Sequence, residues 1–167
     1  MPTSQIPAFI DALYDQITAA FAADQNLSEV IVYDGYGPAY DVGDYLMIGI
    51  EDPTSTSEST SASATQAAAT LGTSHSRDEN GTVTIAALSF LGDVSTPSDN
   101  VQKIVRDRVF EILAAIEGIV RADPSMGLVA GGLFVASMGE SIALDQNVSD
   151  QGTDAALIFS ISYRARI

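Results

Sequence analysis

Two segments of the chain carry apolar residues at intervals of three and four, the spacing that places them on one face of a helix. The first runs from Ile6 to Phe21, and Ser4 before it is a residue type that caps helix N-termini. The second runs from Val101 to Val120, follows a capping signature at residues 96–99, and stops at Asp123-Pro124. We therefore predict two amphipathic helices, of which the second organises the core.

Outside these helices the apolar pattern has a period of two or is continuous over a few residues, as in strands. The predicted strands are residues 29–36, 45–50, 65–71, 82–91, 128–145 and 155–167. The alanines of residues 65–71 also suit a helix, but the two threonines and the short length of this segment favour a strand. The third and fourth predicted strands flank turn-forming residues at 72–81, which predicts a long β-hairpin. The stretch 53–64 holds only Ser, Thr, Ala, one Glu and one Pro. It has too little apolar surface to order itself, so we expect a flexible loop there.

The order of these elements indicates the fold class. Helix, two strands, hairpin, helix and two strands predict an α+β fold with two helices packed on a mixed or antiparallel sheet. The 167 residues have the length of one ordinary domain, and we expect residues 1–167 to form a single one.

The chain has no cysteine, which excludes disulfide frameworks and thiolate metal sites. It lacks both the apolar length of a membrane span and the basic start of a signal peptide, so we expect an unexported protein without membrane contact.

Charge is distributed unevenly along the chain, whose formal net charge is -15. Residues 1–76 contain ten Asp and Glu and no Lys or Arg, whereas residues 77–167 contain twelve acids and all seven bases. Proteins that grip nucleic acid neutralise phosphates with clustered Lys and Arg, so this charge disfavours DNA binding. A solvated acidic surface, for solubility or a salt-rich habitat, explains most individual carboxylates equally well.

Four of the seven bases lie on the second helix, and the central ones fall outside its apolar stripe. The acidic amino-terminal part has no base of its own, so we hypothesise that some of these charges meet across a subunit boundary. The candidate interface residues are Arg106, Arg108, Asp34, Asp41, Asp44 and Asp52. Local pairing of the two arginines with Asp107 or Glu111 is the alternative.

The sequence contains no phosphate-binding loop, nucleophile elbow, zinc spacing or calcium loop. The only histidine, His75, lies between Ser74 and Ser76 close to Asp78, but neighbours in a flexible turn do not make a preorganised triad. Several acids around the second predicted strand could hold a magnesium ion, but nothing fixes their positions: Asp41, Asp44, Glu51 and Asp52. We therefore expect no enzyme, no cofactor and no specific metal site.

Several stretches together resemble the tail terminator proteins of long-tailed phages. They are VIVYDGY at 30–36, GDYLMIGIEDP at 43–53, TQAAATLGTSHSRDENGTVTIAALSFLGD at 65–93, VRADPSMGLVAGG at 120–132 and DAALIFSISYRARI at 154–167. The resemblance spans nearly the whole chain in element order, and each stretch by itself is moderately specific. The Ser/Thr-rich stretch 53–64 departs from the family pattern.

This resemblance implies a structural virion protein that is assembled in the host cytoplasm and lies in the neck of the tail. It would form a hexameric ring that docks on the tail tube, ends tube polymerisation and offers a surface to the head-tail connector. DNA would pass through an acidic, base-poor lumen without specific binding. Another neck or tail-tube component, such as a head-completion protein, is the alternative within this class. An acidic binding module or a metal-assisted hydrolase is the alternative outside it.

Overall fold

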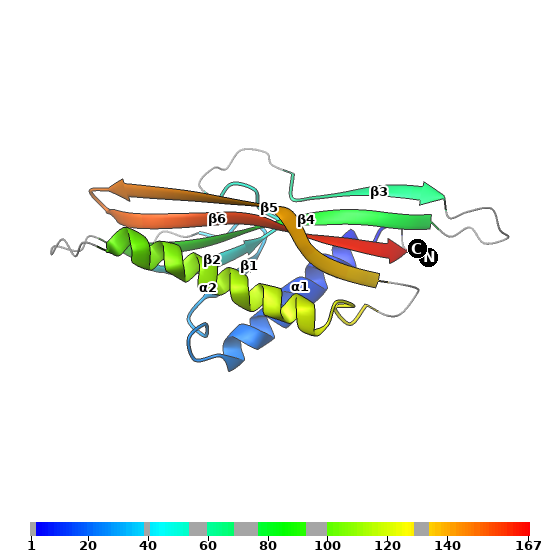
Figure 1. Cartoon of the computed structure of the whole chain (residues 1–167), viewed down its shortest axis with the longest axis horizontal. Coiled ribbons are helices and arrows are strands. Elements are labelled where there is room, and N and C mark those ends of the chain that lie inside the picture. The colour runs from blue at the N-terminus through cyan, green and yellow to red at the C-terminus, as the bar shows by residue number, and fades with distance from the viewer. Residues whose placement is uncertain (1–2, 39–40, 54–59, 69–76, 93–99, 129–133) are drawn as a thin grey trace.

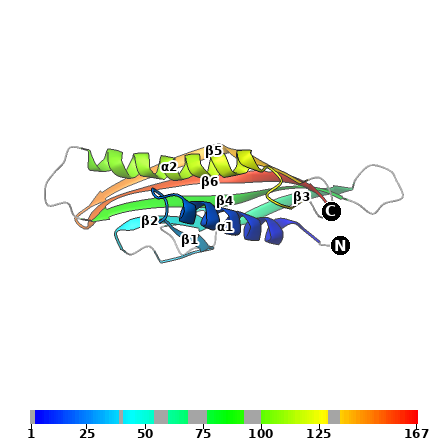
Figure 2. The same cartoon turned by 90° about the horizontal axis from the view of Figure 1, so that it is seen from below.

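The computed structural model describes residues 3–38, 41–53, 60–68, 77–92, 100–128 and 134–167. Its elements are α1 (Ile6–Ala23), β1 (Ile31–Asp34), β2 (Gly43–Ile48), β3 (Ala62–Ala68), β4 (Arg77–Gly92), α2 (Val101–Ala122), β5 (Phe134–Ser149) and β6 (Gly152–Arg166). The strands form one elongated sheet (Figure 1), and both helices lie on the same side of it (Figure 2). The predicted α+β fold with two helices packed on a mixed sheet is confirmed.

The sheet has the strand order β1-β2-β4-β6-β5, with β3 also paired to β4. The β1–β2 pair is parallel, and every other pair is antiparallel. Strand β4 pairs with β3 along its first half and with β2 along its second half, so β2 and β3 follow one another along the same side of β4. One end of the sheet, where both chain termini lie, therefore consists of β3, β4, β6 and β5 (Figure 1).

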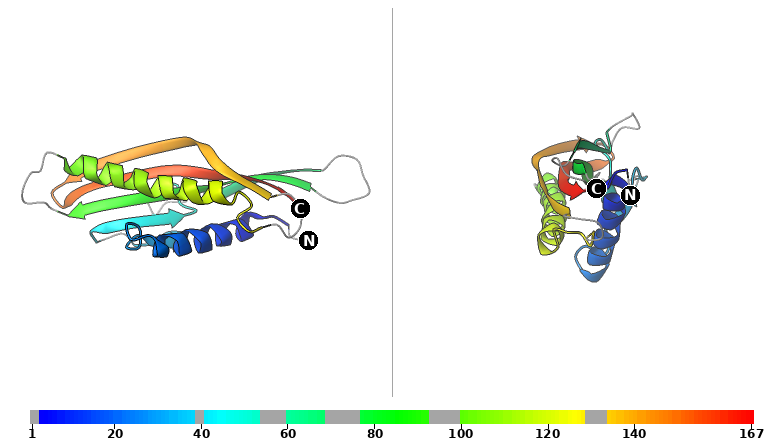
Figure 3. Two further views of the ribbon diagram at one scale, coloured as in Figure 1. Left: turned by 60° about the horizontal axis from the view of Figure 1, so that its bottom comes forward. Right: turned by 90° about the vertical axis from the view of Figure 1, so that its right-hand side faces the viewer.

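The core lies between the helices and one face of the sheet, as the end-on view in Figure 3 shows. Strand β6 alternates strictly, and its core-facing residues are Ala155, Leu157, Phe159, Ile161, Tyr163 and Ala165. The buried line of α2 consists of Val105, Val109, Ile112, Leu113, Ile116 and Val120. Ile104, an apolar residue within the predicted stripe from Val101 to Val120, is 52% exposed. It precedes Val105 by one residue, or about 100° around the helix, which turns it away from the sheet.

The predicted hairpin is confirmed, but both of its strands begin earlier than the sequence indicated. Strand β3 begins at Ala62, inside the predicted loop 53–64, and β4 begins at Arg77, inside the predicted turn 72–81. Residues 77–81 include Asp, Glu, Asn and Gly, which are depleted in strands, but they pair with β3 on one side and β6 on the other. The remainder of that loop at 54–59 and the turn residues 69–76 lie outside the described residues.

Strands β5 and β6 also extend further toward the turn that joins them than the sequence predicted. A two-residue turn at Asp150 and Gln151 joins them, because Ser149 pairs with Gly152. The predicted ends at 145 and 155 were wrong, since the polar residues between them belong to the ladder. The register of β5 shifts between Met138 and Ile142, which marks a β-bulge.

The start of α1 differs from the prediction in its cap. The N-cap residue is Gln5 rather than Ser4, and it makes no side-chain cap hydrogen bond. The Ser4 hydroxyl accepts a hydrogen bond from the Ile6 amide at 3.1 Å and donates one to Glu79 at 3.1 Å. A strand distant in sequence thus contributes to capping this helix. The cap predicted for α2 at residues 96–99 was also wrong: the N-cap residue is Asn100, which makes no side-chain cap hydrogen bond, and residues 96–99 themselves lie outside the described residues.

Candidate subunit interface

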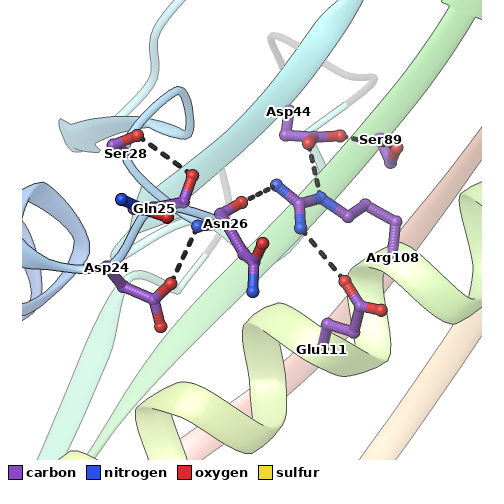
Figure 4. Close-up of polar contacts among 8 residues, drawn as sticks. All are labelled: Asp24, Gln25, Asn26, Ser28, Asp44, Ser89, Arg108 and Glu111. Atoms are coloured by element: carbon purple, nitrogen blue, oxygen red, sulfur yellow. Dashed lines mark hydrogen bonds and ion pairs between the residues drawn. The ribbon is translucent and has the colours of Figure 1, made fainter.

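Arg108 of α2 forms hydrogen bonds to two other parts of the chain and to one residue of its own helix (Figure 4). Its Nε donates to Asp44 Oδ2 on β2 at 2.6 Å, and its Nη2 donates to the backbone oxygen of Asn26, after α1, at 2.6 Å. Its Nη1 donates to Glu111 Oε2 at 3.0 Å, one turn along the same helix. Ser89 of β4 completes the network by donating from Oγ to Asp44 Oδ1 at 2.7 Å. The network therefore fixes α2 to the sheet and to the loop after α1.

Both members of the central ion pair are largely shielded from solvent, each with a side chain 20% exposed. Burial alone would lower the pKa of Arg108, but hydrogen bonds to Asp44 and Glu111 outweigh burial and raise it. The guanidinium is therefore charged throughout the accessible pH range. Charge-assisted hydrogen bonds of this kind are stronger than neutral ones, so the network contributes to the tertiary structure of the single chain.

The structure brings together two of the six residues predicted for an interface, Arg108 and Asp44, within one chain. Arg106 is 42% exposed and pairs with its neighbour Asp107 at 3.5 Å. The local alternative is thus confirmed for Arg106 with Asp107 and for Arg108 with Glu111. The other three candidates are exposed: Asp34, Asp41 and Asp52. Their assignment to an interface stays a prediction.

A second network, around Glu79 of β4, was missed at the sequence level. The Glu79 side chain is 0% exposed. Its Oε1 accepts hydrogen bonds from the Gln5 amide at 2.7 Å, from the Tyr163 hydroxyl at 2.7 Å and from Ser4. Its Oε2 accepts one from Gln66 Nε2 of β3 at 2.5 Å. One carboxylate thereby fixes the start of α1, β3 and β6 to β4.

The hydrogen bonds determine the charge state of this buried carboxyl. Burial alone would raise its pKa, but the donors, led by Tyr163 and the Gln5 amide, together lower the pKa of Glu79 below its ordinary value. Burial, followed by the hydrogen bond to Glu79, raises the pKa of Tyr163, so its hydroxyl remains a donor. Gly81 provides the space for this ring, because a Cβ there would lie 2.4 Å from Tyr163. The only sequence signal was an acid spaced to alternate with apolar positions of the following strand.

The end of the sheet near the chain termini has two free edges of different kinds. Ala64, Gly81, Tyr163 and Ala136 form one row across β3, β4, β6 and β5. Among the described strands, β3 pairs only with β4 and β5 pairs only with β6. The outer edge of β3 and the outer edge of β5 therefore lie on opposite sides of the same four strands. Free edges of this length are sites where strands of another chain can add.

The helix-free face of the same four strands is hollowed and polar. A trough of about 710 Å³ is lined mainly by hydroxyl and amide side chains: Ser63, Thr65, Asn80, Thr82, Ser137 and Ser162. Arg164 also lines it, and Asp78 pairs with Arg164 at 3.7 Å and with Arg166 at 3.1 Å. The hydrogen bond from Arg166 lowers the pKa of Asp78. This surface therefore combines neutral hydrogen-bonding groups with arginines that are already paired.

In the part of the chain that is described, no arrangement of side chains supports the catalytic or metal-binding alternatives. Within it, no group of three or more His, Asp or Glu side chains is placed to hold a metal ion. Of the acids considered for magnesium, Asp44 is engaged by Arg108 and Ser89. His75, with Ser74 and Ser76, lies outside the described residues.

Neither helix in the described ranges is both long and apolar enough to cross a membrane.

Comparison of the sequence with models of known protein families gives no match, and comparison with curated proteins gives none either.

Proposed function

We propose that this protein is a ring-forming structural subunit of a long-tailed phage and that its ring caps the tail tube. The observation that carries the proposal is the pair of unlike free edges, β3 and the first half of β5, on opposite sides of four strands. Because the two edges differ, a contact between them is heterologous. Heterologous contacts produce closed rings when the rotation between subunits closes.

Strand direction favours this contact. Successive strands in the order β3, β4, β6, β5 are antiparallel, so β3 and β5 run in opposite directions. Rotation about an axis parallel to the strands preserves their directions. The β5 edge of one subunit would therefore meet the β3 edge of the next in antiparallel orientation, which continues the hydrogen-bonding pattern of the sheet. Closure would also protect edges that otherwise invite aggregation.

The two helices occupy one face of the sheet, and a closed barrel has more room for them on its outside (Figure 3). The helix-free face would then line the lumen. Its described charged residues at the four-stranded end are Asp78, Arg164 and Arg166, which pair with one another. This part of the lumen would thus be polar and nearly neutral, whereas the composition of the chain suggested an acidic lumen. It would let DNA pass without specific binding, because few free bases meet the phosphates.

The resemblance to tail terminators supplies the biological role that edge geometry alone does not. In that role the ring ends tube polymerisation and joins the tail tube protein to the head-tail connector, within the virion. The exposed charges Arg106, Asp34 and Asp41 are candidates for orienting neighbouring subunits. A head-completion protein or another neck ring would use the same geometry, whereas an acidic binding module would have no need of ring closure.

We expect the purified protein to form a closed ring, by itself or on its tail tube partner. Mass photometry should show a species with the mass of six chains, and negative-stain images should show rings with a central hole. The matched control is Ala64→Pro on β3, because Thr84 donates to Ser61 across the β3–β4 ladder and the alternation of the ladder turns the Ala64 amide to the free edge. This variant should remain folded by circular dichroism and lose the ring. A strict monomer, even in assembled tails, would contradict the proposal.

A further inference from the structure

The second half of β5, after the bulge, is a free edge of its own. Residues 142–149 pair with β6 on one side, and all but Leu144 are exposed. This half lies level with β1 and β2, beyond the end of β3, because Ile142 and Ile48 share a row through β6 and β4. In the proposed ring, β3 of the next subunit would pair with the first half of β5. Because β3 has only seven residues, it would leave the edge at residues 142–149 open. The edge is thus distinct from the proposed ring contact.

The side chains of this edge divide by face. Ile142 and Val148, which are 55% and 57% exposed, lie on the helix-bearing side, since Ile142 is opposite the core residue Phe159. Asp145 lies on the helix-free side, opposite Ala156. An extended segment that added here would meet apolar groups on one face and carboxylates on the other.

The charge around this edge determines which kind of extended segment can pair with it. The chain contains no Lys or Arg from residue 134 to residue 163, but it contains Glu140, Asp145, Asp150 and Asp154 there. A hollow of about 490 Å³ on this part of the molecule is lined by three acids, Asp52, Asp145 and Asp154. Two copies of this edge would bring like charges together, which is unfavourable. A basic strand would meet opposite charge and would be favoured.

We propose that residues 142–149 of β5 bind an extended basic segment of a partner protein, which adds as a further strand of the sheet. Main-chain hydrogen bonds to the free edge provide the affinity. Apolar side chains of the segment contact Ile142 and Val148, and alternate Lys or Arg side chains contact Asp145 and the neighbouring acidic hollow. The binding edge exists in the single chain, so the proposal does not depend on ring formation.

The test uses the whole protein and a synthetic peptide of nine residues that alternates lysine and valine, with blocked ends and a fluorescent label. Fluorescence anisotropy should show saturable binding. Hydrogen exchange should show new protection of the amides of residues 142–149. N-methylation of alternate peptide residues keeps the charge but removes main-chain donors, and it should weaken binding about tenfold or more. A purely electrostatic contact would survive this change.

Protein variants locate the contact. Asp145→Lys should weaken peptide binding about fivefold at low salt, because it replaces an attraction with a repulsion. Asp11→Lys is the matched control, since it makes the same change at an exposed position of α1 and should leave binding unchanged. The proposal is overturned if the peptide fails to bind, if the methylated peptide binds equally well, or if both variants behave alike. None of these results bears on whether the protein forms a ring.

Discussion

Replacing Glu79 with alanine should lower the free energy of unfolding by about 3 kcal/mol, because it leaves one buried and three partly buried donors without an acceptor. The donors come from the start of α1, from β3 and from β6, so the loss affects the whole four-stranded end of the sheet. Urea denaturation of the purified chain measures the change. Glu140→Ala removes an exposed acid and should stay within about 0.5 kcal/mol of the wild type. Equal stability of the two variants would show that the Glu79 network is not stabilising.

The same carboxyl predicts a pH dependence with a definite sign. The pKa of Glu79 in the folded protein lies below its ordinary value of 4.5. Its contribution to stability is therefore fully present above that value and is lost as pH falls through the folded pKa. Glu79→Gln, which cannot ionise, should be less stable than the wild type at neutral pH and should approach it in acid. A difference that stays constant with pH would contradict this assignment.

Replacing Arg108 with methionine should destabilise the single chain by about 2 kcal/mol, since Asp44 would lose its charged partner while remaining largely buried. The measurement is again denaturation of the isolated chain. Arg106→Met is the matched control on the same helix, and because Arg106 is 42% exposed it should change stability little. If both variants are equally stable, the network of Arg108 does not hold α2 to the sheet.

Variants of the two arginines also distinguish an effect on folding from an effect on ring assembly. Charge reversal of both arginines together would confound the two, because Arg108 is bonded within the chain. Arg106→Glu alone should leave stability nearly unchanged, and it should weaken ring formation at low salt if Arg106 faces an acid of the next subunit. Partial recovery on reversing Asp34 or Asp41 would identify the partner.

The helices and the succession of strands along the chain could be predicted because burial imposes a period on apolar residues. The stripe ending at Phe21 and the alternation from Ala155 to Ala165 both face the core. The start of β4 could not be predicted in this way. Its residues are polar. They form a strand because β3 and β6 pair with them on both sides and because Glu79 accepts hydrogen bonds from three other elements. Tertiary context there overrides local preference.

The candidate site was predictable in composition but not in geometry. The sequence indicated that arginines of α2 lie off its apolar face, and the structure places Arg106 and Arg108 there. It gave no sign that Arg108 reaches Asp44 rather than a neighbouring chain, because the two are brought together by the packing of α2 on the sheet. The free edges depend on strand order, which periodicity does not specify.

The most direct test of the central claim, that β3 of one subunit pairs with β5 of the next, is disulfide trapping. The chain has no cysteine, so every disulfide would come from the introduced pair. Thr65→Cys on β3 should be combined with Val135→Cys or Ser137→Cys on the same face of β5. Thr65 and Val135 share a row through Asn80 and Arg164, so β4 and β6 separate them within one chain. Three strand spacings are about 14 Å, too far for a disulfide inside the subunit.

Mild oxidation should yield a ladder of covalent multimers that ends at six chains on a non-reducing gel, for at least one of the two pairs. Thr65→Cys with Val148→Cys, at the far end of β5, is the control and should yield little product. A monomer band for both pairs, or a ladder equally strong in the control, would contradict the β3–β5 ring.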